Sequence, residues 1–195
     1  MQSNDNEKDE LLWTRFKSGD TESFVSLFRN YYGDLFNYGC KITDDHTLIE
    51  DCIQDLFIDL WRTNGRADIV SLKAYFFSAF KFKLARAIAK VNKTRKLNSS
   101  LAENDFEISH ELFMINDQED QLLKNRVYNA IKELSPRQKE IIYLKFHEGL
   151  SYEEVSEIMG LSYQASRNLI YQAIKVLKKI IANFIVPVVL YSLQF

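Results

Sequence analysis

The 195-residue sequence contains few of the residues that form turns and crosslinks. It has six Gly, two Pro and two Cys. Folds with many tight turns need more Gly and Pro, so we predict neither a β-sandwich, nor a barrel, nor a Gly-rich repeat. Cys40 and Cys52 are too few for a disulfide framework, and we expect both thiols to be buried. No signal peptide is recognised, so a cytoplasmic protein is expected.

Catalytic signatures are also missing from the sequence. It has no nucleophile elbow, no Gly-rich phosphate loop and no HExxH motif. Carboxylates accompany His46 and Glu50 at helical spacing, but nothing else converges there to hold a metal ion. We therefore predict that the protein is not an enzyme and binds neither a metal nor a cofactor. A helical enzyme that uses the carboxylates near His46 is one alternative, and it requires metal dependence.

Hydrophobic residues make up 46% of the chain, and they recur with the period of an α-helix. One apolar stripe runs over residues 24–36, with Thr21 as the expected N-cap, and a second runs over 49–61. A shorter helix is expected over 8–17. The periodicity stops in a polar, acidic stretch at 92–117 and then resumes. This pattern predicts an all-α fold made of two small helical domains.

The loss of periodicity also sets the predicted domain limits. We place the first domain at 8–91 and the second at 118–183, joined by a flexible linker at 92–117. Residues 184–195 form a strongly apolar tail that contains Pro187. The tail is too short to span a bilayer. It either folds back on the second domain or meets a partner.

The net charge of −2 hides a strong segregation of charge along the chain. Residues 68–100 carry eight Lys or Arg and one Asp, whereas both flanking stretches are acidic. The cations follow a run of aromatic residues in a helix expected over 72–90, which Ser71 can cap. Aromatic rings stack on unpaired bases and cations neutralise phosphates, so this helix is a candidate for nucleic-acid binding. We assign one or two of Tyr75, Phe76 and Phe82 to nucleic acid and the other aromatics to the core.

The second domain carries a helix-turn-helix pattern. Ser135 and Ser151 each begin a capping box, and Gly160 suits a left-handed turn. Ser162 can cap a longer helix that runs from Tyr163 to about residue 183. A short helix, a Gly-containing turn and a longer helix with a polar face are typical of this motif.

The polar face of that longer helix is suited to reading base edges. Arg pairs with guanine, and Asn or Gln pairs with adenine, in the major groove. The residues of the face are Gln164, Arg167, Asn168, Tyr171, Lys175 and Lys178. A helical hairpin with a solvated polar face is the alternative. Ser166 stands where such motifs usually hold an aliphatic residue, so we expect the packing to differ there.

In combination, these features resemble the extracytoplasmic-function (ECF) subfamily of RNA polymerase sigma factors. The resemblance covers about residues 11–181, and segment 49–61 carries the family's D-x-x-Q-[DE]-x-F pattern. It implies that this segment is the helix that binds bacterial core RNA polymerase. The residues implied in that contact are Asp51, Gln54, Asp55, Phe57 and Asp59.

The resemblance also implies two sites for promoter DNA. Loop 63–70 and helix 72–90 are similar to the segment that melts and reads the minus-ten element. The residues implied there are Asn64, Tyr75, Phe76, Lys81, Lys83, Arg86 and Lys90. The second domain resembles the module that reads the minus-thirty-five element. The residues implied there are Ser162, Gln164, Arg167, Asn168, Tyr171 and Lys175.

The same resemblance implies how the protein works with its partners. The acidic linker would thread toward the polymerase interior, and an anti-sigma factor at the membrane would hold the protein inactive. A free-standing helix-turn-helix regulator with an N-terminal sensor or dimerisation domain is the alternative. That regulator would bind duplex DNA specifically without the polymerase.

Overall fold

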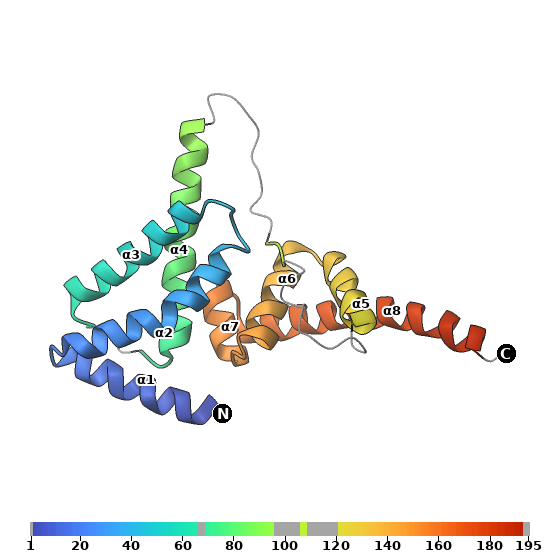
Figure 1. The fold of residues 1–195 in the computed structure, drawn as a ribbon, viewed down its shortest axis with the longest axis horizontal. Coiled ribbons are helices and arrows are strands. Elements are labelled where there is room, and N and C mark those ends of the chain that lie inside the picture. The colour runs from blue at the N-terminus through green and yellow to red at the C-terminus, as the bar shows by residue number, and fades with distance from the viewer. Residues whose placement is uncertain (1, 66–68, 96–105, 109–120, 193–195) are drawn as a thin grey trace. The chain divides into compact units, whose positions relative to one another are not determined.

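The chain forms two compact units, Met1–Asn104 and Asp105–Phe195. The computed structural model describes residues 2–65, 69–95, 106–108 and 121–192. Every regular element within those ranges is a helix (Figure 1). The predicted all-α fold of two small helical domains is therefore confirmed.

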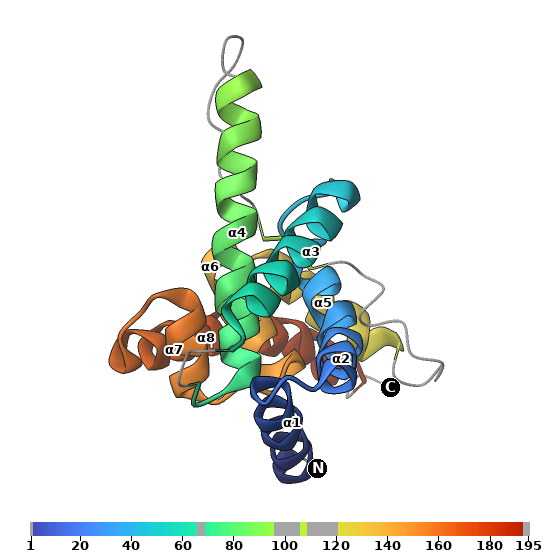
Figure 2. The ribbon, with the colours of Figure 1, turned by 90° about the vertical axis from the view of Figure 1, so that its left-hand side faces the viewer.

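The first unit contains α1 (Gln2–Lys17), α2 (Thr21–Gly39), α3 (His46–Thr63) and α4 (Leu72–Arg95). Helix α2 packs against each of the other three, and α3 also packs against α4. Figures 1 and 2 both show the C-terminal part of α4 projecting beyond the other helices of this unit. The exposed side chains of that part include Arg86, Lys90 and Lys93.

Side-chain caps explain where these helices begin. The carboxylate of Asp20 accepts hydrogen bonds from the Glu22 backbone N–H at 3.0 Å and from the Ser23 hydroxyl at 2.6 Å. Asp20 is thus the N-cap of α2, and the prediction of Thr21 was wrong by one residue, because the two-oxygen carboxylate satisfies two donors at once. The Ser23 hydroxyl also holds the pKa of Asp20 below its usual value. The expected Ser71 cap is confirmed, since its hydroxyl accepts from the Ala74 backbone N–H at 3.2 Å.

The core of the first unit is mainly aromatic. The largest completely buried rings belong to Phe16, Tyr38, Phe76, Phe77 and Phe80. Close approach of α2 and α3 requires a residue without a side chain at Gly39. A Cβ atom there would lie 2.8 Å from the Ile49 side chain, which is too close for any real contact. This dense core fixes which faces of α3 and α4 point outward.

The second unit contains α5 (Gln121–Lys132), α6 (Pro136–Ile142), the π-helical turn η3 (Tyr143–His147), α7 (Tyr152–Met159) and α8 (Tyr163–Ser192). Both predicted capping boxes are present, because Ser135 and Gln138 bond reciprocally, as do Ser151 and Glu154. Gly160 ends α7 with a φ of +61°, the left-handed conformation that Gly adopts without strain. Helix α8 packs against α5, α6 and α7.

Several helices are longer than predicted. Helix α1 begins at Gln2 rather than near residue 8, and α4 continues to Arg95 because no Gly or Pro interrupts it. Helix α8 continues to Ser192 through most of the stretch predicted to be a separate tail. Within the ranges given above, no helix is long and apolar enough to cross a membrane.

Candidate functional site

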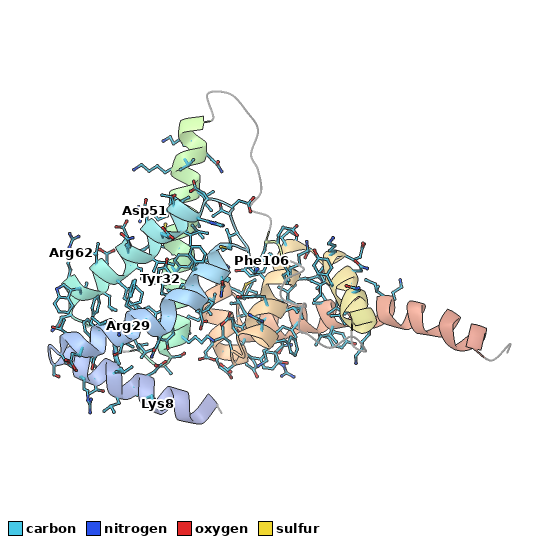
Figure 3. All side chains as sticks on the ribbon, in the orientation of Figure 1. Lys8, Arg29, Tyr32, Asp51, Arg62 and Phe106 are labelled. Carbon is cyan, nitrogen blue, oxygen red and sulfur yellow. The ribbon has the colours of Figure 1, made fainter. Side chains whose placement is uncertain are left out.

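The outward face of α3 carries a polar stripe. Asp51, Gln54 and Asp55 are exposed, and the exposed Ile58 continues the same i, i+3, i+4 spacing. The opposite face is buried and consists of Ile49, Cys52, Ile53, Leu56 and Leu60. Figure 3 labels Asp51 and Arg62 on the outer side of this helix. The stripe is thus held rigidly at the surface by a helix whose other side is core.

Phe57 does not belong to that surface. Its side chain is only 3% exposed. Its ring stacks on Phe76 with centroids 5.2 Å apart and meets the edge of Phe28 at 5.0 Å. The prediction that Phe57 contacts the polymerase is therefore wrong, because the helical period places it on the buried face between Ile53 and Leu60. Its role is to hold α3 against α2 and α4.

Asp59 differs from the acidic residues of the polar stripe, Asp51 and Asp55, because it forms an ion pair inside the unit. Its carboxylate forms an ion pair with the Lys83 ammonium of α4, with Oδ2 and Nζ 2.5 Å apart. The Asp59 side chain is 54% exposed and that of Lys83 is 26% exposed. The sequence analysis assigned Asp59 to core polymerase and Lys83 to promoter DNA. In the structure these two residues are in direct contact.

The aromatic residues of α4 lie partly in the core and partly at the surface. Phe76 is completely buried, 4.5 Å from the Tyr31 ring, so the prediction that it stacks on a base is wrong. Tyr75 is half-buried beside Trp13. Burial raises the pKa of Tyr75, and the charge of Asp59 raises it further, so this phenol stays protonated.

Phe82 is the aromatic side chain of α4 that the structure leaves at the surface. It is 63% exposed, and the Arg86 guanidinium lies 5.4 Å from its ring centroid. Phe82 was one of three aromatic candidates for nucleic acid, but the minus-ten residues implied by the family resemblance did not include it. The helical period contained the signal, because Phe76, Phe80 and Leu84 occupy the opposite, buried face.

Helix α1 braces the loop that follows α3. Asn64 ends α3 in the left-handed conformation, and its side-chain amide donates to the Lys17 carbonyl at 3.5 Å. Gly65 has a φ of +59°, and a Cβ there would lie 3.0 Å from the Trp13 ring. Residues 66–68 lie outside the described ranges. No local pattern in the sequence predicted this support, because it depends on contacts between residues far apart in the chain.

The two thiols and the carboxylates near His46 form no catalytic cluster. Cys52 is buried as expected, whereas Cys40 is only half-buried. Burial raises the pKa of both thiols, which favours their neutral, unreactive form. His46 is exposed and contacts the Phe36 ring. Among the residues that the structure describes, no three His, Cys, Asp or Glu side chains are grouped as a metal site requires.

Helix α8 presents its predicted polar face to solvent. Gln164, Arg167, Asn168, Tyr171, Lys175 and Lys178 are all exposed. The Gln164 amide donates to the Asn168 amide oxygen at 3.0 Å, and the Arg167 guanidinium lies 5.8 Å from the Tyr163 ring centroid. The inner face buries Ser166, Ile170 and Ala173 against the rest of the unit. Ser162 caps the helix by accepting from the Ala165 backbone N–H at 3.2 Å.

Part of the predicted linker belongs to the second unit. Phe106 and Ile108 are buried, and the Phe106 ring meets the Tyr143 ring at 5.7 Å (Figure 3). Between them, Glu107 accepts from the Lys139 ammonium at 3.1 Å. These three residues are therefore an ordered part of the stretch predicted to be a flexible linker at 92–117. Residues 96–105 and 109–120 lie outside the described ranges.

Comparison with known protein families covers both units. Residues 27–94 match the family of sigma-70 region 2, and residues 124–177 match the family of sigma-70 region 4. Together the two matches span more than half of the chain. The chain is an ECF RNA polymerase sigma factor.

Three relatives of this sigma factor are also named as RNA polymerase sigma factors. The ECF sigma factor BldN of Streptomyces coelicolor is 23% identical over 177 residues, which cover 88% of this chain and 65% of BldN. The sigma factor CarQ of Myxococcus xanthus is 21% identical over 87% of this chain and 95% of its own length. The sigma-H factor of Pseudomonas aeruginosa is 25% identical over 89% of this chain and 93% of its own length.

Solved structures show the same fold. CnrH, in complex with the cytosolic domain of CnrY, matches this sigma factor with a TM-score of 0.58 at 19% identity, covering 90% of this chain and 97% of CnrH. RpoE of Bartonella quintana, in complex with the anti-sigma factor NepR, matches with a TM-score of 0.56 at 19% identity. That match covers 83% of this chain and 95% of RpoE.

Proposed function

We propose that this sigma factor binds bacterial core RNA polymerase in the cytoplasm and directs it to specific promoters without catalysing a reaction itself. One observation carries the proposal: each unit of the chain presents a polar helix face that its core does not use. In the first unit this face lies on α3, and in the second it lies on α8. The proposal of different partners for the two faces is supported by a region-2 family match in the first unit and a region-4 family match in the second.

The polar stripe of α3 is the proposed contact with core polymerase. Asp51, Gln54 and Asp55 supply charge and hydrogen-bond acceptors, and Ile58 adds an apolar centre. An exposed apolar side chain flanked by charges is a common arrangement in protein interfaces, where the apolar part is buried and the charges guide encounter. In our proposal residues 8–91 form the module that carries this contact and the minus-ten site.

Helix α4 is the proposed contact with the minus-ten element. Exposed Phe82 offers a ring for an unstacked base, while Lys81, Arg86 and Lys90 neutralise phosphates. Asn64 lies at the loop that α1 braces. Tyr75 is half-buried and offers only its exposed edge.

Helix α8 is the proposed reader of the minus-thirty-five element. In a helix-turn-helix the N-terminal residues of the second helix meet the base edges. Ser162, Gln164, Arg167 and Asn168 occupy that end, and Tyr171 and Lys175 follow toward the backbone. In our proposal residues 118–183 form this module, and the acidic stretch 92–117 lies between the two DNA contacts.

We also propose control by an anti-sigma factor. The support is that RpoE, a sigma factor with this fold, was solved in complex with the anti-sigma factor NepR. CnrH, which has the same fold, was solved in complex with the cytosolic domain of CnrY. A partner that covers the α3 stripe would block core polymerase directly.

The proposed function is tested by reconstitution with purified core RNA polymerase, followed by size-exclusion chromatography and run-off transcription. The wild-type chain is expected to co-elute with core and to start transcription at defined sites. Charge reversal at Asp51→Lys and Asp55→Lys is expected to abolish co-elution. The matched control reverses two exposed acidic residues elsewhere, Glu10→Lys and Glu133→Lys, and should retain both activities.

A free-standing regulator gives the opposite pattern. It would not co-elute with core, would bind specific duplex DNA alone, and would be unaffected by the α3 reversal. That result would overturn the proposed function.

A further inference from the structure

The ion pair between Asp59 and Lys83 joins the helix proposed to bind polymerase to the helix proposed to bind DNA. Asp59 follows Asp51 and Asp55 at intervals of four residues, so each step turns it by about 40° around the helix. That rotation carries Asp59 from the outward stripe toward α4. Its carboxylate is already bonded to the Lys83 ammonium at 2.5 Å. Asp59 is therefore placed differently from the other acidic residues of α3.

We propose that Asp59 is a positioning residue that holds Lys83 toward promoter DNA and that it is not a contact for core polymerase. This inference rests on the proposed function, because it takes promoter DNA as the ligand of α4.

The chemistry of the lysine side chain supports this role. An ammonium group has three donors, and a bond to Asp59 leaves two for phosphate oxygens. A free Lys side chain has high rotamer entropy, which it loses when it binds one phosphate. Holding Nζ beside α3 removes part of that loss before DNA arrives. Lys83 follows the exposed Phe82 directly on the helix proposed to bind promoter DNA.

Both charged groups also act on Tyr75. Burial raises the pKa of Tyr75, the charge of Asp59 raises it further, and the charge of Lys83 lowers it. Tyr75 and Lys83 are eight residues apart on α4 and share one face.

Positioning and simple electrostatics predict opposite results for Asp59→Asn. Removing a carboxylate near DNA strengthens binding if only net charge matters. If Asp59 positions Lys83, the same change weakens promoter opening although the protein has become more positive. The expected loss in opening rate is about twofold to fivefold, the range for a partly exposed ion pair.

The test uses the full chain bound to core polymerase and measures core affinity, opening rate and its salt dependence. Asp59→Asn and Lys83→Gln should each keep core affinity within about twofold, whereas the matched Asp55→Asn weakens it. The double variant should open promoters no more slowly than Lys83→Gln alone, because the two residues act as one unit. Lys83→Gln should reduce the salt slope by about one, as expected for a lost phosphate contact. Asp59→Glu should recover part of the opening rate.

Three outcomes overturn the inference. The first is loss of core affinity in Asp59→Asn as large as in Asp55→Asn. The second is an unchanged or faster opening rate in Asp59→Asn. The third is additive loss in the double variant. If neither Asp51→Asn nor Asp55→Asn changes core affinity, the proposed function itself fails, and that pattern differs from all three. Thermal unfolding of each variant confirms that the unit remains folded.

Discussion

The hydroxyl groups of Ser156 and Ser166 are hydrogen-bonded at 2.9 Å inside the contact between α7 and α8. Ser166 is completely buried, and the Ser156 hydroxyl oxygen also lies 2.6 Å from the Tyr152 carbonyl oxygen. A polar pair thus replaces the aliphatic contact expected at this point of a helix-turn-helix. The bond links α7 to α8 at a buried point, so the Ser166 hydroxyl has a polar partner inside the unit.

We predict strong coupling between these two serines. Ser156→Ala leaves the Ser166 hydroxyl without this partner and should reduce stability by about 1–2 kcal/mol. The double change to Ala should cost less than the sum of the two single changes, because no buried hydroxyl is left behind. Amide hydrogen exchange of α7 and α8 measures the effect within the second unit. Additive costs would show that the bond contributes little.

Phe106 provides a second prediction, because it anchors a linker segment in the second unit. Phe106→Ala should destabilise that unit by about 3 kcal/mol, since it empties a buried aromatic site against Tyr143. Hydrogen exchange in α6 reports the change. The matched control is Glu107→Gln, which removes an ion pair at a largely exposed carboxylate and should cost at most about 1 kcal/mol. If the amides of α6 exchanged equally slowly in the Phe106 variant and in the wild type, the anchoring role would be contradicted.

The helices of this chain were predictable because periodicity and caps are local properties. The two capping boxes and the left-handed Gly160 follow from residues three or four positions apart, and the structure contains all three. The outer face of α8 followed from the same period. The N-cap of α2 was misplaced because Asp20 and Thr21 are both good caps, and the sequence does not rank them.

The errors in the candidate sites have a different cause. Phe57 was assigned to the polymerase through the D-x-x-Q-[DE]-x-F pattern of the family that the sequence resembles. Phe76 was a candidate for nucleic acid because base stacking and core packing require the same aromatic residues. Only the packing of α3 on α4 shows that the two rings stack on each other. The Asp59–Lys83 pair and the docking of Phe106 also join residues more than 20 positions apart. No local pattern reports such contacts.

Gly65→Ala tests the loop after α3, and Gly33→Ala in α2 is the matched comparison. Gly65→Ala should destabilise the first unit by about 1–2 kcal/mol, because its φ is +59° and the added Cβ would meet the Trp13 ring. Gly33 lies within α2 with open space around it, so Gly33→Ala should stabilise by about 0.5–1 kcal/mol. Denaturant unfolding followed by Trp fluorescence measures both, since Trp13 and Trp61 lie in this unit. A neutral Gly65→Ala would show that α1 does not brace the loop.

Arg167 tests the recognition face of α8. If it pairs with a guanine through two hydrogen bonds, Arg167→Ala should cost about 1–3 kcal/mol on the correct minus-thirty-five sequence and relax the preference at one base. Lys178→Ala, farther along the same exposed face, is the control and should change binding little. Holoenzyme binding to a set of single-base promoter variants provides the measurement. An equal loss on every sequence would make Arg167 a phosphate contact.

Phe82 and Phe76 lie on the same helix, but the first is at the surface and the second is in the core. Their Ala variants should therefore have different effects. Phe82→Ala should leave the unfolding midpoint of the first unit almost unchanged, because the ring is 63% exposed. It should slow promoter opening, since stacking of a base on an aromatic ring is worth about 1–3 kcal/mol. Phe76→Ala should instead reduce stability by about 3–5 kcal/mol, because its ring fills the space between Tyr31 and Phe57. Permanganate footprinting of the opened strand and thermal unfolding distinguish the two. If Phe82→Ala opened promoters at the normal rate, this ring would be excluded from the minus-ten contact. The contact would then be made by the cations of α4.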